Sequence, residues 1–273
     1  MIQLPNVTIS QAVLDKLKEY QDDIDGKPTF AAKSARAKTS FKSKNTKRNA
    51  TFNAVKEALT KMCSGARRCV YCEDSVGDEV EHIRPKDFFP ENCFVWENYV
   101  YACGNCNSPK NNKFALFRDD NGDFYEVNLY VGVEPPKGKD AMINPRNENP
   151  MNFCVLDFND FKFVALPNLD STNKKRAEYT FFDLLNLNEV PREFLRKARE
   201  NAYGNYKMRL SYYAKNKANL SEIVINKIIE QLKQEAHPTV WKEMQRYYRE
   251  NWLKPIDEEL HNLFEQSPEA LNW

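Results

Sequence analysis

Residues 69–72 read CVYC and residues 103–106 read CGNC, and these two short cysteine repeats decide how the middle of the chain is built. Each C-x-x-C turn presents two thiolates, and two such turns complete the tetrahedral four-sulfur shell of a structural zinc ion. We therefore predict Zn²⁺ on Cys69, Cys72, Cys103 and Cys106. Because four thiolates close the shell, this metal has no open position for catalysis. Free thiols or a redox pair are the alternative interpretation of the same spacing.

The composition is that of a folded protein with a substantial core. Of the 273 residues, 41% are hydrophobic and 29% are charged. No apolar run approaches the roughly 20 residues that cross a bilayer, and the start, MIQLPNVTIS, has no secretory signal pattern. We expect a cytoplasmic protein without a membrane partner. Seven cysteines then favour metal binding over disulfides, with Cys63, Cys93 and Cys154 as ordinary buried residues.

The net charge of +1 hides a strongly basic segment. Residues 27–68 contain twelve Lys or Arg and one acid, so the rest of the chain has a formal charge of −10. Such a segment fits a polyanion-binding arm, because contacts to phosphates release counterions. A solvated charge run is the alternative. The candidate nucleic-acid contacts in this segment are Lys42, Lys44, Lys47 and Arg48.

Hydrophobic periodicity predicts an α+β fold. Helices are expected over residues 11–20 and 51–62, whereas residues 30–49 have few large apolar side chains and are predicted to be loop or arm. Strands are expected over 124–133 and over 153–166, with a turn at Asn159-Asp160. The last hundred residues predict helices over 188–215, over 220–235 and from Pro238 onward. An apolar and aromatic stripe on the third of these helices is expected to be core: Val240, Trp241, Met244, Tyr247, Tyr248 and Trp252.

The segment between and after the cysteine pairs contains EVEHIRPKD at 79–87, WEN at 96–98 and NSPK at 107–110. Phosphodiester hydrolysis needs a hard cation, a base for the attacking water and donors for the scissile group. Glu81 and Asn107 offer oxygen ligands for Mg²⁺ or Mn²⁺. His82, with an ordinary pKa near 6.5, suits the base. The phosphate-directed charges would be Arg84, Lys86 and Lys110.

A plainer interpretation treats His82 as a satisfied loop histidine and the acids and amides as solvation of the zinc loop. Against it stands the ordered set E-H-x-x-P-K, W-x-N and C-x-x-C-N-x-x-K, which resembles the HNH endonuclease family in its zinc-knuckle form. The resemblance implies a ββα-metal motif around one catalytic ion. It assigns the metal-binding acid to Glu81, the general base to His82, the loop-fixing asparagine to Asn98 and the closing metal ligand to Asn107. The chain departs from the family in having Glu where Asp is more common and Asn where His gives the last letter.

Longer phrases resemble the PtuB family of nuclease subunits from Septu and related retron anti-phage systems. These include VEHIRPKDFFPE (80–91), INPRNENP (143–150) and LLNLNEVPREFLRKAR (184–199). This resemblance implies a PtuA-like ATPase partner of the ABC/SMC type and, in the retron case, a retron RNA and a reverse transcriptase. The chain contains no G-x-x-x-x-G-K-[ST] motif, so any ATP requirement would come from another chain.

The predicted organisation has four parts. An N-terminal helix and basic arm (1–50) precede a zinc-stapled ββα-metal (HNH) nuclease core (51–120), a small β-rich segment (121–170) and a mainly α-helical C-terminal region (171–273). The leading functional hypothesis is a metal-dependent endonuclease that cleaves DNA in prokaryotic defence. The second is the same chemistry on RNA such as tRNA. The third is a non-catalytic zinc module that binds nucleic acid or a partner protein.

Overall fold

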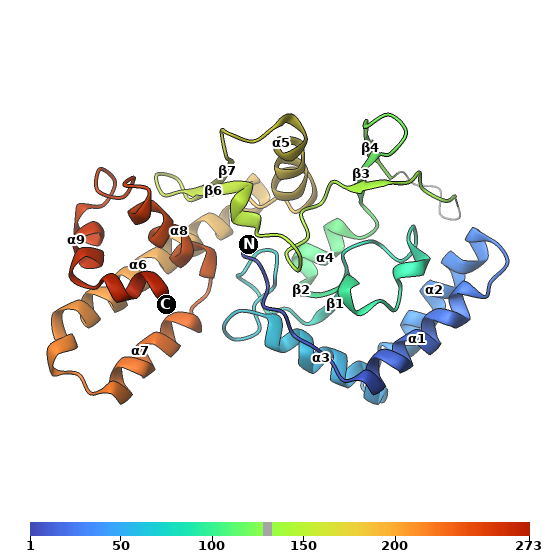
Figure 1. Cartoon of the computed structure of the whole chain (residues 1–273), viewed down its shortest axis with the longest axis horizontal. Helices are drawn as coiled ribbons and strands as arrows, with labels where there is room; N and C mark the ends of the chain where they lie inside the picture. The colour runs from blue at the N-terminus through green and yellow to red at the C-terminus, as the bar shows by residue number, and fades with distance from the viewer. Residues whose placement is uncertain (128–132) are drawn as a thin grey trace.

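The computed structural model describes residues 1–127 and 133–273, and it is mixed α/β with more helix than sheet. Figure 1 shows the N-terminal helices at the lower right, small sheets in the middle and at the top, and the C-terminal helices at the left. A single hydrophobic cluster draws buried side chains from all of these regions.

The N-terminal helices enclose one side of the zinc segment. The predicted helix over residues 11–20 is present and longer, as α1 (Gln11–Asp25). The predicted helix over 51–62 is α3 (Ala50–Met62), with Asn49 accepting from the Phe52 amide as its N-cap. The four apolar residues spaced along one face of α3, Phe52, Val55, Leu59 and Met62, are all buried.

The prediction of a loop or arm over residues 30–49 is wrong for most of that range. Residues Phe30–Lys44 form helix α2. Thr29 is its N-cap residue, and the Thr29 hydroxyl accepts a hydrogen bond from the Ala32 amide. The face that α2 buries consists of Ser34, Ala37 and Ser40. Such small side chains let the helix approach its neighbours closely but produce no hydrophobic stripe in the sequence.

The middle of the chain forms the expected strand–strand–helix order. Strand β1 (Glu79–His82) pairs antiparallel with β2 (Tyr99–Ala102), so that Glu79 faces Ala102 and His82 faces Tyr99 across the ladder. Helix α4 (Gly104–Lys110) follows directly, and Cys103 is its N-cap residue. One cysteine turn therefore precedes β1, and the other lies at the junction of β2 and α4. The assignment of this unit as an HNH core stays a prediction.

Two further small sheets follow. One has the order β4–β3–β5, formed by Phe124–Glu126, Ala115–Arg118 and Gly138–Asp140. The predicted strand over 124–133 is thus observed as β4 up to Glu126, and its residues 128–132 lie outside the described part of the chain. The predicted hairpin over 153–166 is confirmed as β6 (Cys154–Asp157) and β7 (Lys162–Ala165).

The C-terminal region is helical as predicted. Most of the apolar stripe of α8 (Pro238–Arg249) is core, because Val240, Trp241, Met244 and Tyr247 are buried. Trp252 does not belong to that face, since α8 ends at Arg249 and the Trp252 side chain is 40% exposed.

Within the described residues, no helix combines the length and apolar character needed to cross a bilayer. The helices are α5 (Ser171–Glu178), the π-helical turn η4 (Tyr179–Leu184), α6 (Glu193–Asn216), α7 (Glu222–Lys233), α8 (Pro238–Arg249) and α9 (Glu258–Gln266).

Short 3-10 helices connect these elements, and two of them lie in the loop between β1 and β2. The 3-10 segments are η1 (Pro90–Asn92), η2 (Trp96–Asn98), η3 (Pro150–Asn152), η5 (Val190–Arg192), η6 (Lys217–Asn219) and η7 (Pro268–Asn272).

Candidate functional site

The four predicted zinc ligands form one buried cluster. The Sγ atoms of Cys69, Cys72, Cys103 and Cys106 all lie within 4.8 Å of one another. A tetrahedral shell with Zn–S bonds of about 2.3 Å places sulfurs about 3.8 Å apart, and the Cys72 and Cys103 sulfurs are 3.8 Å apart. The cluster therefore fits a structural zinc ion. As expected, the Cys93 and Cys154 thiols lie apart from it and are buried, whereas Cys63 is half-buried.

Three predicted catalytic residues meet at one pocket. Glu81 and His82 reach it from β1, and Asn107 reaches it from α4, twenty-five residues later in the chain. The pocket has a volume of about 270 Å³. Its other lining residues come from α2, β1, the loop after β1, α4 and the turn after α4: Phe41, Val80, Pro85, Lys86, Ser108, Asn111 and Asn112.

His82 is held in one orientation. Its Nε2 lies 3.0 Å from the Cys93 carbonyl oxygen, and the rings of Phe41 and Tyr99 pack edge-on against it at 4.4 and 5.2 Å between centroids. A carbonyl oxygen can only accept, so this contact assigns the proton to Nε2 and leaves Nδ1 as the acceptor. A fixed imidazole with a bare Nδ1 is the arrangement that a general base requires.

The pKa of His82 lies below the ordinary value for histidine. Burial lowers it to about 3, and the positive charges of Lys86 and Lys110 act in the same direction. Removing a cationic imidazolium from water costs free energy, and two nearby cations add repulsion. The imidazole of the free protein is therefore neutral at neutral pH.

The lowered pKa of His82 predicts a pH-dependent stability. In the unfolded chain the group titrates near 6.5, so between pH 3 and 6.5 the unfolded state binds more protons and the free energy of unfolding rises with pH. Between pH 5 and 7 this contribution amounts to about 2 kcal/mol. Urea unfolding should show this rise for the wild type and lose it in His82→Gln. Equal pH dependence in both proteins would contradict the assignment.

Glu81 forms an ion pair with Lys110, which was predicted to contact phosphate. The carboxylate is buried, and its Oε1 lies 2.5 Å from Nζ of Lys110, which also donates to the His82 carbonyl oxygen at 2.9 Å. Burial raises the pKa of Glu81, and Lys110 partly offsets this effect. Lys110 is fully buried, so it does not present its ammonium to phosphate as predicted. It neutralises Glu81 instead.

Asn107 has a partner that the sequence reasoning missed. Its Nδ2 donates a hydrogen bond to Oε2 of Glu79 at 2.7 Å. Its Oδ1 can then serve as an oxygen ligand for a metal ion. Glu79 stands two residues before Glu81, so both carboxylates lie on the same face of β1. The sequence E-V-E at 79–81 could have indicated this, because two carboxylates separated by one residue lie on the same face of a strand. Glu79, Glu81 and Asn107 together form an oxygen-rich surface between β1 and α4.

Asn98 ties the end of β1 to the loop that follows it. Its Oδ1 accepts from the Arg84 amide at 2.8 Å, and its Nδ2 donates to the carbonyl oxygens of Arg84 and Asn92, both at 3.0 Å. The side chain is buried. Three hydrogen bonds to two backbone segments hold the loop that also carries the Cys93 carbonyl.

Replacing Asn98 by alanine removes all three of these hydrogen bonds. Because buried backbone groups are left unpaired, we expect the free energy of unfolding to fall by about 2–4 kcal/mol. Urea unfolding measures the loss. Asn105→Ala, at an exposed position of α4, is the matched control and should change it by less than about 0.5 kcal/mol. A loss in Asn98→Ala no larger than in the control would contradict the role of Asn98.

The remaining predicted cations have different settings. Arg84 donates from Nε and Nη2 to both carboxylate oxygens of Asp140, at 2.6–3.0 Å, so its guanidinium is already engaged. Lys86 lines the pocket, with Nζ 3.6 Å from Oδ1 of Asp87. Of the two, Lys86 is the one that lies at the candidate site.

Part of the basic segment, in α2, reaches the edge of the same pocket. Helix α2 places Phe41 against His82, and the next residue, Lys42, is exposed. Lys47 and Arg48 are exposed in the turn before α3, whereas Lys44 is half-buried with Nζ 4.8 Å from the centre of the Tyr20 ring. Of this segment, Phe41 lines the pocket, and Lys42, which follows it in the sequence, is exposed.

Comparisons with known proteins found a similar protein, which matches about half of the chain. No protein-family model matches the chain, and no solved structure matches it. Among curated proteins, Septu protein PtuB of Bacillus thuringiensis is 29% identical over 143 residues. The chain is a distant homologue of PtuB. The match covers 50% of this chain and 42% of PtuB, so less than half of PtuB's length is represented here. The predicted resemblance to PtuB is confirmed at this level.

Proposed function

We propose that this chain is a metal-dependent HNH endonuclease that hydrolyses phosphodiester bonds of DNA. The observation that carries the proposal is the convergence of Glu81, His82 and Asn107 on one pocket, with the histidine oriented by the Cys93 carbonyl. A pure zinc module has no need for a neutral, fixed imidazole beside a buried carboxylate. The similarity to a Septu protein supports a role in anti-phage defence.

In the proposed mechanism, His82 accepts a proton from the attacking water at Nδ1 while Nε2 stays hydrogen-bonded to Cys93. Lys86 contributes positive charge at the pocket for the phosphate. A divalent ion, Mg²⁺ or Mn²⁺, held by Glu81 and Asn107, would supply neutralisation of the phosphate and of the leaving oxygen.

The residues present fit such an ion. Carboxylate and amide oxygens are hard ligands of the kind that Mg²⁺ and Mn²⁺ prefer, and Glu81 and Asn107 both line the pocket.

The proposed assembly includes a partner ATPase of the PtuA type, and in a retron setting a retron RNA and a reverse transcriptase. The similarity to PtuB supports the ATPase. The exposed cations Lys42, Lys47 and Arg48 support contact with a nucleic-acid backbone beside the pocket.

The function is tested by incubating the full chain with duplex DNA, single-stranded DNA and total tRNA, with Mg²⁺, with Mn²⁺ or with neither. We expect cleavage of DNA only when a divalent ion is added. Cleavage that depends on a 2′-hydroxyl would replace DNA by RNA as the substrate. Binding without cleavage under every condition, including with a co-purified ATPase, would identify a non-catalytic zinc module.

A further inference from the structure

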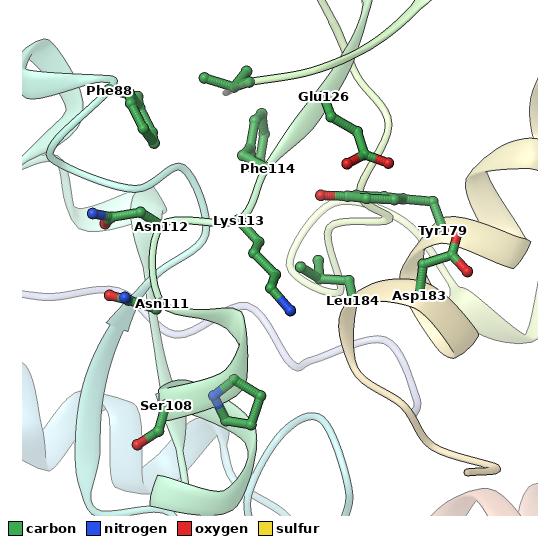
Figure 2. A pocket seen from close by; sticks show the side chains of 12 residues that line it. Phe88, Ser108, Asn111, Asn112, Lys113, Phe114, Glu126, Tyr179, Asp183 and Leu184 are labelled. Carbon is green, nitrogen blue, oxygen red and sulfur yellow. The ribbon is translucent and has the colours of Figure 1, made fainter. Parts of the chain in front are cut away.

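A second, larger pocket lies beside the candidate catalytic pocket (Figure 2). Its volume is about 760 Å³, and its walls come from the end of α4 with the turn that follows, the end of β4, and the π-helical turn η4. Ser108, Asn111 and Asn112 line both pockets. The two pockets therefore share one wall, and a chain that occupies the first can reach the second.

The lining combines apolar and polar groups in the way that small-molecule sites do. Phe88, Phe114, Tyr179 and Leu184 supply the apolar part. Polar groups surround it, and Figure 2 shows the Lys113 and Glu126 side chains on opposite sides of the pocket interior. A nucleobase has the matching chemistry, since its faces are apolar and its edges carry hydrogen-bond donors and acceptors.

The backbone of two walls is irregular. Asn111 ends α4 with a φ of 37°, which non-glycine residues rarely adopt, and this places Asn111 and Asn112 between the pockets. On the other side, η4 is π-helical, and such turns are rare and frequently occur at functional sites. It brings Tyr179 and Asp183 to the same pocket.

Tyr179 carries an unsatisfied polar group at this place. Its side chain is 4% exposed, and its hydroxyl has no hydrogen-bond partner among the described residues. In Figure 2 the hydroxyl points toward Phe114 and the pocket interior. Buried hydroxyls normally find a partner, so this one is consistent with a polar ligand that the pocket receives.

We propose that this pocket binds one unpaired base of the substrate strand, next to the nucleotide whose phosphate is cleaved. The proposal rests on the nuclease function proposed above and deepens it. A base inside the pocket cannot pair with a complementary strand, so the substrate must be single-stranded or locally unpaired there. Glu126 and Asp183 can accept from an amino group on the base edge. Lys113 is exposed and lines the pocket, so it can contact the adjoining phosphate.

The test measures binding of the full chain to fluorescently labelled single-stranded oligonucleotides by anisotropy, without added Mg²⁺ or Mn²⁺. In a series of oligonucleotides, one base at a time is replaced by an abasic site, which keeps every phosphate. We expect affinity to fall about tenfold at one position and little elsewhere. A series in which every position is equivalent would overturn the proposal, as would the absence of binding.

Pocket-filling variants locate the effect. Glu126→Trp and Asp183→Trp add a large side chain from two different elements, β4 and η4, at exposed positions, so each tests the pocket if the other misfolds. The abasic effect should disappear in both and persist in Glu200→Trp, the same kind of change on an exposed face of α6. Persistence in the pocket variants would overturn the proposal.

Two further outcomes separate the alternatives. Mononucleotides that bind the pocket without competing against the oligonucleotide would show a site for a free nucleotide and overturn the assignment to the substrate strand. If the abasic effect is found but the wild type cleaves no substrate, the base pocket stands and the nuclease proposal fails. If the wild type cleaves and no position shows an abasic effect, the reverse holds.

Discussion

Replacing His82 by glutamine is expected to lower the rate of phosphodiester cleavage by about 100- to 10,000-fold, the usual contribution of a general base. Glutamine keeps a side-chain N–H that can donate to the Cys93 carbonyl, but it has no basic nitrogen. It also fills most of the space between Phe41 and Tyr99 that the imidazole occupies. The loss should therefore appear in cleavage with zinc content retained.

The measurement is a single-turnover cleavage assay in saturating Mg²⁺ or Mn²⁺, together with thermal unfolding and metal analysis. His261→Gln makes the same chemical change in α9 and should cleave at the wild-type rate. His82→Ala should be equally inactive but less stable, because it leaves a cavity against two aromatic rings. Native-rate cleavage by His82→Gln would remove His82 from the mechanism.

Replacing Cys103 by serine is expected to have the largest effect on stability. Structural zinc sites bind with apparent free energies of about 10–16 kcal/mol, and a closed shell needs all four thiolates. Cys103 is also the N-cap residue of α4, so loss of the metal frees the end of β2 and the start of α4 together. We expect loss of bound zinc and a fall in the free energy of unfolding of several kcal/mol.

Metal content by mass spectrometry and thermal unfolding measure this result. Cys63→Ser is the matched control, since Cys63 is half-buried and does not belong to the cluster. It should keep one zinc ion per chain and unfold close to the wild type. A Cys103→Ser protein with full zinc content and an unchanged melting temperature would show that Cys103 does not hold the zinc ion.

The cysteine pairs of the zinc cluster and the hairpin of β6 and β7 were predictable because they depend on local signals. The spacing within each C-x-x-C turn is a property of four neighbouring residues, and the hairpin of β6 and β7 follows from alternation around one turn. The burial of α3 followed from apolar residues at helical spacing. Each of these patterns is complete within a short stretch of sequence.

The features that were missed depend on contacts between distant residues. A lysine is normally a surface residue, and only the packing of α4 on β1 shows that Lys110 is fully buried beside Glu81. Helix α2 was missed because its buried residues, such as Ser34 and Ala37, are small, so the sequence shows no periodic row of large apolar residues. The lowered pKa of His82 likewise arises from burial by Phe41 and Tyr99, which come from other segments.

The position of α2 has a consequence for how the protein would sense its substrate. The helix that carries the exposed cation Lys42 also supplies Phe41, the ring that lies on the histidine. Under the proposed function, a nucleic-acid strand bound at Lys42 would contact the same helix that covers the imidazole with Phe41. Binding of the strand and proton transfer by His82 would then be coupled through α2. Charge changes on α2 should alter the turnover rate along with the affinity, so the two roles of this helix cannot be dissected by removing its lysines alone.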